Sequence, residues 1–173
     1  MANTYTLISS NVLTSSAASV TFSAIPSTYT DLVLRCSIRI ATTGDTKDAV
    51  YILLNNDTTG NLTSNTRVQG EGSTASSARS SGSSYNFSFI ADRDLATSNT
   101  FGSAEIYIPN YAGSANKVGA VFDVAETNAT SGNWVGARAN LWRSTAAITS
   151  IVLTADNNLM SGSSFYLYGI KKN

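Results

Sequence analysis

The chain has 173 residues, a usual length for one domain, so we expect a single domain spanning 1–173. Charged residues make up only 13% of it, and eleven basic residues balance eleven acidic ones. This balance argues against a nucleic-acid-binding protein, which needs a basic surface. The single cysteine excludes an intrachain disulfide.

The sequence also argues against secretion and membrane insertion. The first residues, MANTYTLISS, lack the basic and long apolar regions of a signal peptide, and no apolar run approaches the length of a membrane span. We therefore expect a protein that has no membrane partner and is not exported through a signal peptide.

Apolar and polar residues alternate along most of the chain, and helical periodicity is almost absent. The clearest case is the segment 32–40, LVLRCSIRI, in which every second residue is apolar and Cys36 is expected to be an inert core residue. Other segments of this kind are 4–9, 19–23, 49–56, 81–90, 101–109, 117–126, 133–144, 148–156 and 165–170. We predict an all-β, jelly-roll-like β-sandwich with roughly nine or ten antiparallel strands.

One long polar segment interrupts this alternation. Residues 56–84 are rich in Ser, Thr, Asn and Gly, and they contain few residues that could enter a core. We expect a long loop here, with at most a short strand or turn around Arg67–Gly70. A loop of this length in a compact domain is either functional, ordered by a partner, or simply mobile.

The sequence offers little for catalysis. It has no histidine, which excludes Ser-His and Cys-His triads, and it has no phosphate-binding loop. The local acidic clusters, DTKD at 45–48 and DRD at 92–94, each contain a cation, so we expect self-neutralised loops. We predict that the protein is not an enzyme and needs no cofactor; a calcium ion held by the loop DRDLATSN remains an alternative.

Two tryptophans stand out in the segment NWVGARANLWRS. If 133–144 is a strand, Trp134, Arg138 and Trp142 share one face, and the small apolar residues share the other. We place the small apolar face in the core, and we predict that these three residues contact another subunit or a particle, because Trp and Arg are enriched at interfaces. The alternative is that a loop or a bulge buries them within the sandwich.

Nearly the whole chain resembles a family of small virion proteins of tailed bacteriophages, particularly those that infect marine and freshwater bacteria. The most specific boxes are IPSTYTDL at 25–32, IPNYAGS at 108–114 and LYGIKK at 167–172. The resemblance implies a structural or adhesive virion component, jelly-roll-like and trimeric, which assembles in the host cytoplasm. It implies nothing for residues 58–84, where such proteins differ most.

Two roles follow from this resemblance as expectations. The first is a capsid decoration or cement protein that binds the major capsid protein on the outside of the head. The second is a tail-fibre or tail-tip module that binds glycan on the host surface, which the long polar loop and the tryptophans would favour. A free carbohydrate-active protein is a third hypothesis, weakened by the lack of a convincing acid pair.

Overall fold

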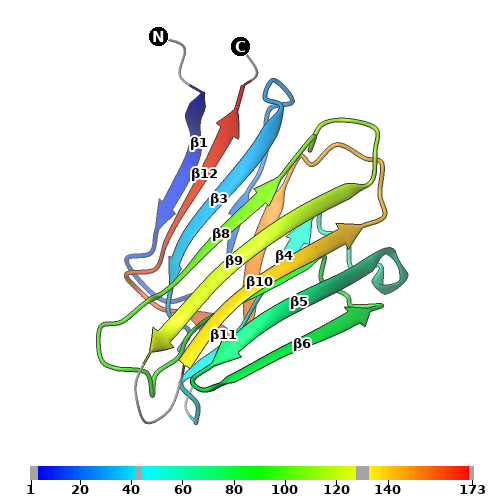
Figure 1. The fold of residues 1–173 in the computed structure, drawn as a ribbon. Coiled ribbons are helices and arrows are strands. Elements are labelled where there is room, and N and C mark those ends of the chain that lie inside the picture. Colours follow the sequence, from blue (N-terminus) through cyan, green and yellow to red (C-terminus); the bar gives the residue numbers. More distant parts are fainter. Residues whose placement is uncertain (1–3, 42–43, 128–132, 172–173) are drawn as a thin grey trace.

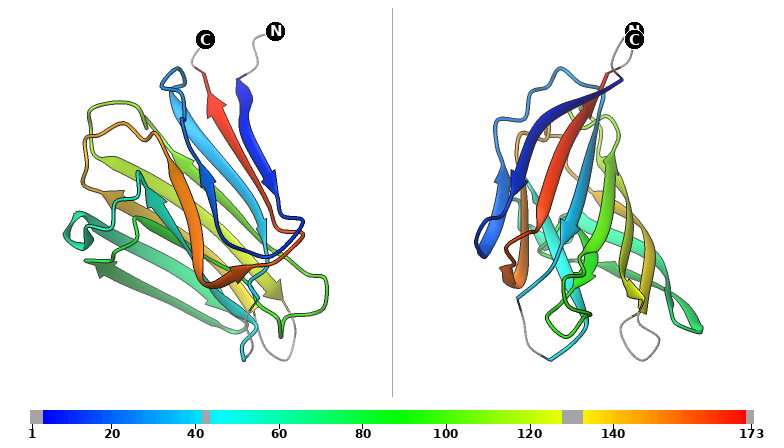
Figure 2. Two further views of the ribbon diagram at one scale, coloured as in Figure 1. Left: turned by 180° about the vertical axis from the view of Figure 1, so that it is seen from behind. Right: turned by 90° about the vertical axis from the view of Figure 1, so that its left-hand side faces the viewer.

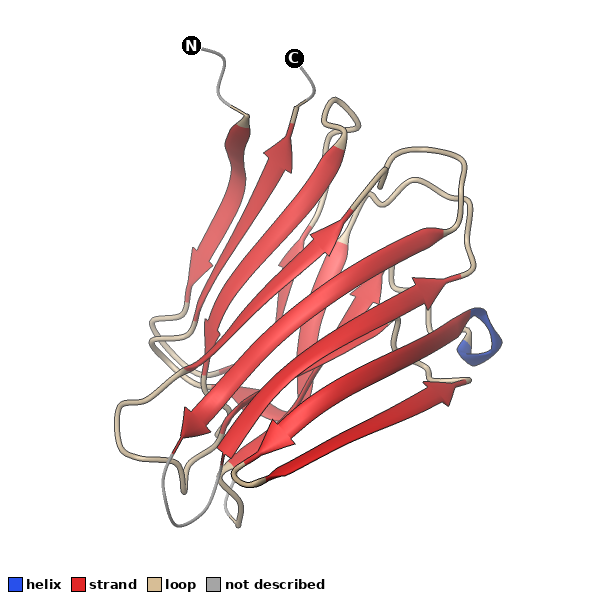
Figure 3. Cartoon of the chain, in the orientation of Figure 1, coloured by secondary structure: helices blue, strands red, loops and turns tan. Residues whose placement is uncertain are grey.

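The computed structural model describes residues 4–41, 44–127 and 133–171, and it is all-β, as predicted. The described part contains twelve strands and one short 3₁₀ helix, η1 (Gly60–Leu62), shown in blue in Figure 3. The strands are β1 (Tyr5–Val12), β2 (Ala17–Phe22), β3 (Asp31–Ile38), β4 (Lys47–Leu54), β5 (Thr63–Glu71), β6 (Thr74–Ser81), β7 (Phe87–Asp92), β8 (Gly102–Ile108), β9 (Lys117–Thr127), β10 (Asn133–Trp142), β11 (Ile151–Leu159) and β12 (Ser164–Ile170). The prediction of nine or ten strands is therefore short by β5 and β6.

The strands form two antiparallel sheets, which Figures 1 and 2 show packed as the two layers of a sandwich. The larger sheet has the order β1-β12-β3-β8-β9-β10-β5-β6, and the smaller has the order β2-β11-β4-β7. Successive strands from β1 to β4, from β7 to β8 and from β11 to β12 cross between the sheets, which is the wrapping of a jelly roll. The hairpins β5–β6 and β9–β10 extend the larger sheet beyond this eight-stranded framework.

The core lies between the sheets and is built by the predicted alternation. In and just after β3 the apolar side is buried throughout: Leu32, Leu34, Cys36, Ile38 and Ile40. The matching residues of β4, β8 and β11 bury their side chains against it. Cys36 is buried in this core, so the prediction of a core cysteine is confirmed, and this burial raises the pKa of its thiol. Each large side chain removed from water in this way contributes about 1.5–3 kcal/mol.

The prediction of a long loop over 56–84 is wrong. Residues 63–71 and 74–81 form the hairpin β5–β6, and β5 pairs with β10 along its length. The side chains of this hairpin are mostly short and polar, and every residue of β6 is exposed. Apolar alternation could not mark these strands, because backbone pairing holds them in the sheet: β5 pairs with β10, and β6 pairs with β5.

The three specific sequence boxes meet in the folded chain. The ring of Tyr29 packs on Gly169, where an added Cβ would lie 2.3 Å from a ring carbon. The carboxylate of Asp31 accepts hydrogen bonds of 2.8 Å from the Tyr107 hydroxyl and from the Asn110 backbone N–H. The three boxes are thus joined by contacts within the fold. The last residue of the third box, Lys172, lies outside the described residues.

Candidate functional site

The structure reverses the predicted faces of the tryptophan strand, β10. Trp134, Arg138 and Trp142 point between the sheets and are only 5%, 6% and 2% exposed. Side chains this buried in a single chain offer almost no surface to a second subunit. The alternative, burial within the sandwich, is what the structure has.

A polar network explains the inward orientation. Oδ2 of Asp123, on β9, accepts hydrogen bonds from the indole Nε1 of Trp134 at 2.9 Å and from the backbone N–H of Ile90 at 2.6 Å. It also pairs with Nη2 of Arg138 at 3.3 Å, and Arg138 in turn donates to the Ser88 hydroxyl at 3.1 Å. These contacts bind the extended part of the large sheet to β7, the edge strand of the small sheet.

The geometry of the network depends on a glycine. An added Cβ at Gly136 would lie 2.5 Å from Oδ1 of Asp123 and 3.0 Å from Nε1 of Trp134. The Trp134 ring also has the charged groups of Lys47 and Arg138 at 5.9 and 5.6 Å from its centre. Burial lowers the pKa of Arg138, and Asp123 opposes this effect by stabilising the charged guanidinium. The network is therefore a structural device of the interior.

Trp142 is fixed at the other end of β10. Its Nε1 donates a hydrogen bond of 2.7 Å to Oδ2 of Asp57, which lies in the connection before η1. Burial alone would raise the pKa of Asp57, but hydrogen bonds from Thr59 and Trp142 outweigh it, and the pKa lies below its ordinary value.

The opposite side of this part of the sheet is apolar and open. Val118, Phe122 and Val124 of β9, Val135 of β10 and Val68 of β5 are 44–58% exposed. In the register of the strands, Val124 lies opposite Val135, and Ala137 lies between Phe122 and Val68. We call this surface the outer apolar face. Its outward positions are all uncharged: Val118, Ala120, Phe122, Val124, Val135, Ala137, Ala139, Leu141, Ser64, Thr66, Val68 and Gly70.

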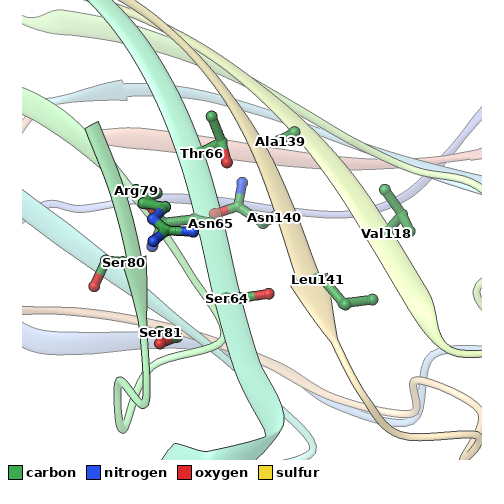
Figure 4. Close-up of a pocket in the computed structure, with 10 residues that line it drawn as sticks. All are labelled: Ser64, Asn65, Thr66, Arg79, Ser80, Ser81, Val118, Ala139, Asn140 and Leu141. Carbon is green, nitrogen blue, oxygen red and sulfur yellow. The ribbon is translucent and has the colours of Figure 1, made fainter. Parts of the chain in front are cut away.

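Shallow depressions cross the outer apolar face where its side chains are small. One, of about 670 Å³, is lined by Val118, Ala139 and Leu141 together with Arg79 of β6 and shorter polar residues of β5, β6 and β10, as Figure 4 shows. A second, of about 610 Å³, lies beside Phe122 and Val135. The surface is thus uneven and apolar at its centre. Polar groups border it on both sides: Arg79 at the β5–β6 margin, and Glu105 of β8, which lies opposite Phe122 and pairs with Arg35.

The acidic clusters are held in ion pairs. Nη1 of Arg93, in the cluster 92–94, lies 3.5 Å from Oδ2 of Asp48, in the cluster 45–48. The cation of the other cluster, Lys47, lies 3.6 Å from Oε2 of Glu71 on β5. Both cations thus form ion pairs with carboxylates outside their own cluster, which corrects the prediction that each cluster neutralises itself. Among the described residues, no group of three or more His, Cys, Asp or Glu side chains is placed to hold a metal ion.

The loop proposed as a calcium site is organised by an arginine. The guanidinium of Arg39 donates hydrogen bonds of 2.9–3.0 Å to the carbonyl oxygens of Asp94, Ala96, Thr97 and Thr100. Oxygen atoms that could have converged on a cation thus converge on the Arg39 side chain. Within the described ranges, no helix has the length and apolar character needed to cross a membrane.

Comparisons with known proteins give a loose likeness of fold. No protein-family model matches the chain, and no curated protein matches it. A crystal structure of exo-inulinase from Aspergillus awamori aligns with 96% of this chain at 10% identity and a TM-score of 0.46, and the chain spans 29% of its length. The CBM40 domain of Ruminococcus gnavus IT-sialidase, bound to alpha2,3 sialyllactose, aligns over 96% of this chain and 95% of its own at 11% identity and a TM-score of 0.37. No statement about function follows from likenesses this distant.

The outer apolar face was missed at the sequence level, although its signal was present. In both β9 and β10 one set of alternate residues is apolar and the other is mixed, and the apolar set suggests the core side. In β10 the mixed set has the larger side chains, including both tryptophans. In β9 the mixed set contains Asp123, whose buried carboxylate requires hydrogen-bond donors around it. Side-chain volume and hydrogen bonding, rather than hydropathy, therefore determine which face of β9 and β10 points into the core.

Proposed function

We propose that the protein is a non-enzymatic structural module that binds a partner protein through the outer apolar face. Following the sequence resemblance, we further propose that it is a virion protein of a tailed bacteriophage and that it decorates the capsid exterior by binding the major capsid protein. The observation that carries the proposal is the exposure of Phe122 and four valines on one face of β5, β9 and β10.

An apolar face of this kind favours a protein partner. Contiguous exposed apolar surface is rare on proteins that act alone, and it marks contact sites. The core of a protein interface is depleted in charge and enriched in aromatic residues, and the centre of the outer apolar face presents Phe122 among exposed valines. A partner that covered Phe122 would remove from water a side chain now 58% exposed.

The glycan-binding alternative loses the two features that favoured it. The polar segment 56–84, expected as a loop, is mostly the hairpin β5–β6, and both Trp134 and Trp142 are buried. A sugar ring stacks on an exposed aromatic surface, which these indoles do not present. The capsid role is therefore the one we argue, and the tail role becomes an outcome of the test.

The location is tested by labelling particles. An antibody against the recombinant protein should label the heads of tailed phage particles produced by cells that carry the gene, as seen by electron microscopy. Label on the tail instead would support the tail-fibre role. Particles free of label, with the protein present in the same cells, would contradict a virion protein of either kind.

The surface is tested with a matched pair of variants. Phe122→Asp should lower retention on particles at least tenfold, because it places a charge at the centre of the outer apolar face, and it should leave the melting temperature almost unchanged. Val12→Asp, on β1, is the control, because Val12 is similarly exposed (55%) but lies on another part of the sheet. Equal retention of both variants would show that the outer apolar face is not the contact.

A further inference from the structure

The two sheets have four edge strands, and they are protected to different degrees. The register of β1 is broken between Leu7 and Ser9, and that of β11 against the short strand β2 is broken after Thr154. The free edge of β7 is covered, because its Ile90 N–H donates to Asp123. β6 is different: it pairs with β5 without a register shift over eight residues, and all of it is exposed. Proteins usually block such an edge with proline, lysine or a bulge.

The backbone groups that β6 leaves open can be identified from its pairing. The N–H of Gly82 donates to the carbonyl of Thr63, and the N–H of Arg143 donates to the carbonyl of Leu62. Because backbone direction alternates along an antiparallel strand, the even-numbered residues of β6 bond to β5. The odd-numbered residues, Ala75, Ser77, Arg79 and Ser81, direct their N–H and C=O groups away from the sheet.

We propose that β6 binds β6 of a second copy of this chain in antiparallel orientation, about a two-fold axis perpendicular to the sheet. The odd-numbered residues must then face one another. With Ala78 opposite Ala78 of the second copy, Ser77 faces Arg79 and Ala75 faces Ser81, so every open group of the strand finds a partner. Moving the axis by one residue, to Ser77, would leave Ser81 opposite Ser73, which lies in the turn outside the strand.

The chemistry of β6 suits a second copy of itself. Its sequence, TASSARSS, has one charge, Arg79, and the proposed register sets Arg79 opposite serine rather than opposite another arginine. The other side chains are small on both faces, so two strands can approach to hydrogen-bonding distance. A perpendicular two-fold axis keeps the faces of the sheet, so the outer apolar faces of the two copies continue into one surface.

The interface is small, and this sets its strength. A contact between two eight-residue edges lies at or below the roughly 1,200 Å² at the low end for stable complexes, so we expect a dissociation constant in the micromolar range. The product is a dimer, in contrast to the trimer that the sequence resemblance implies. Sedimentation equilibrium of the recombinant protein separates the two.

The decisive variant is Ser77→Pro. The Ser77 N–H points away from β5, so proline removes no bond within the chain but blocks strand addition at the centre of the interface. We expect the wild-type protein and the control Ser77→Thr, which keeps the N–H, to dimerise as concentration rises to the millimolar range. At concentrations near the wild-type dissociation constant Ser77→Pro should be mostly monomeric, because we expect its own dissociation constant to be raised at least tenfold.

Hydrogen exchange of the wild-type chain provides a readout that needs no variant. The amides of Ala75, Ser77, Arg79 and Ser81 should become protected as concentration rises, whereas the amides of Ser76 and Ala78 should be protected at every concentration. A wild-type chain that stays monomeric, a trimer, or a dimer whose odd-numbered amides stay open would overturn the proposal. These measurements use the isolated protein, so their failure leaves the proposed binding through the outer apolar face untouched.

Discussion

The carboxylate of Asp123 and the indole of Trp134 are joined by a 2.9 Å hydrogen bond across neighbouring strands of the larger sheet. The same carboxylate oxygen serves Arg138, and the side chain of Asp123 is fully buried. One oxygen therefore neutralises a buried cation, orients a tryptophan and covers the edge of the smaller sheet.

Replacing this carboxylate should destabilise the fold. Asp123→Asn would leave the Arg138 charge buried without its counter-ion, and loss of one partner of a buried pair costs about 3–5 kcal/mol. The free energy of unfolding in urea measures the loss. The control is Glu105→Gln: Glu105 pairs with Arg35 on the surface, so its loss should cost about 0–1 kcal/mol. Equal costs for the two variants would contradict a central role for Asp123.

Truncation of Trp142 should affect folding of the single chain. Trp142→Ala removes a side chain that is 2% exposed, and we expect a loss of about 3–5 kcal/mol in the free energy of unfolding. Trp142→Phe keeps most of the apolar volume and loses the bond to Asp57, so it should cost less. Weakened particle binding by a Trp142→Ala chain of unchanged stability would restore the interface role that the structure argues against.

Calcium should have little effect on stability. The carbonyl oxygens of the loop 93–100 bind Arg39, so the melting temperature should stay constant within about 1 °C between chelator and 1 mM calcium. A site with a dissociation constant of 10 µM would instead add about 2.7 kcal/mol of stability at that concentration. Arg39→Met should release the loop, which faster hydrogen exchange of its amides would report.

The tyrosines provide a test in alkali. Burial, and then the charge of Asp156, raise the pKa of Tyr51 to about 12, and its ring stacks on Tyr85 at 3.8 Å. Since the folded pKa exceeds the unfolded value of about 10, the stability linked to Tyr51 is complete below pH 10 and is lost as pH rises to about 12. Tyr51→Phe should remove a late step from the ultraviolet titration of tyrosine, and Asp156→Asn should move that step to lower pH. A titration unchanged in both variants would contradict this environment.

The sequence predicted the fold class well and the site poorly, for physical reasons. In the segment 32–40 one face is apolar and the other mostly polar, so alternation alone predicted its orientation. In β10 hydropathy favoured the face of Val135, Ala137 and Leu141 as the core side, whereas the observed orientation depends on Asp123, eleven residues before Trp134. The hairpin β5–β6 has almost no apolar signal, because its pairing energy lies in backbone bonds that any residue but proline can make.

The pairing of β1 with β12 has a consequence for the time course of folding. Tyr5 lies opposite Ile170, and β12 separates β1 from β3 in the larger sheet. The strand β1 therefore has no neighbour in its sheet until β12 has left the ribosome. Closing a loop of that length is slow, and sandwiches dominated by such distant pairings fold in milliseconds to seconds. Until then the alternating segment TYTLIS stays unpaired, a period in which chaperones have most to protect.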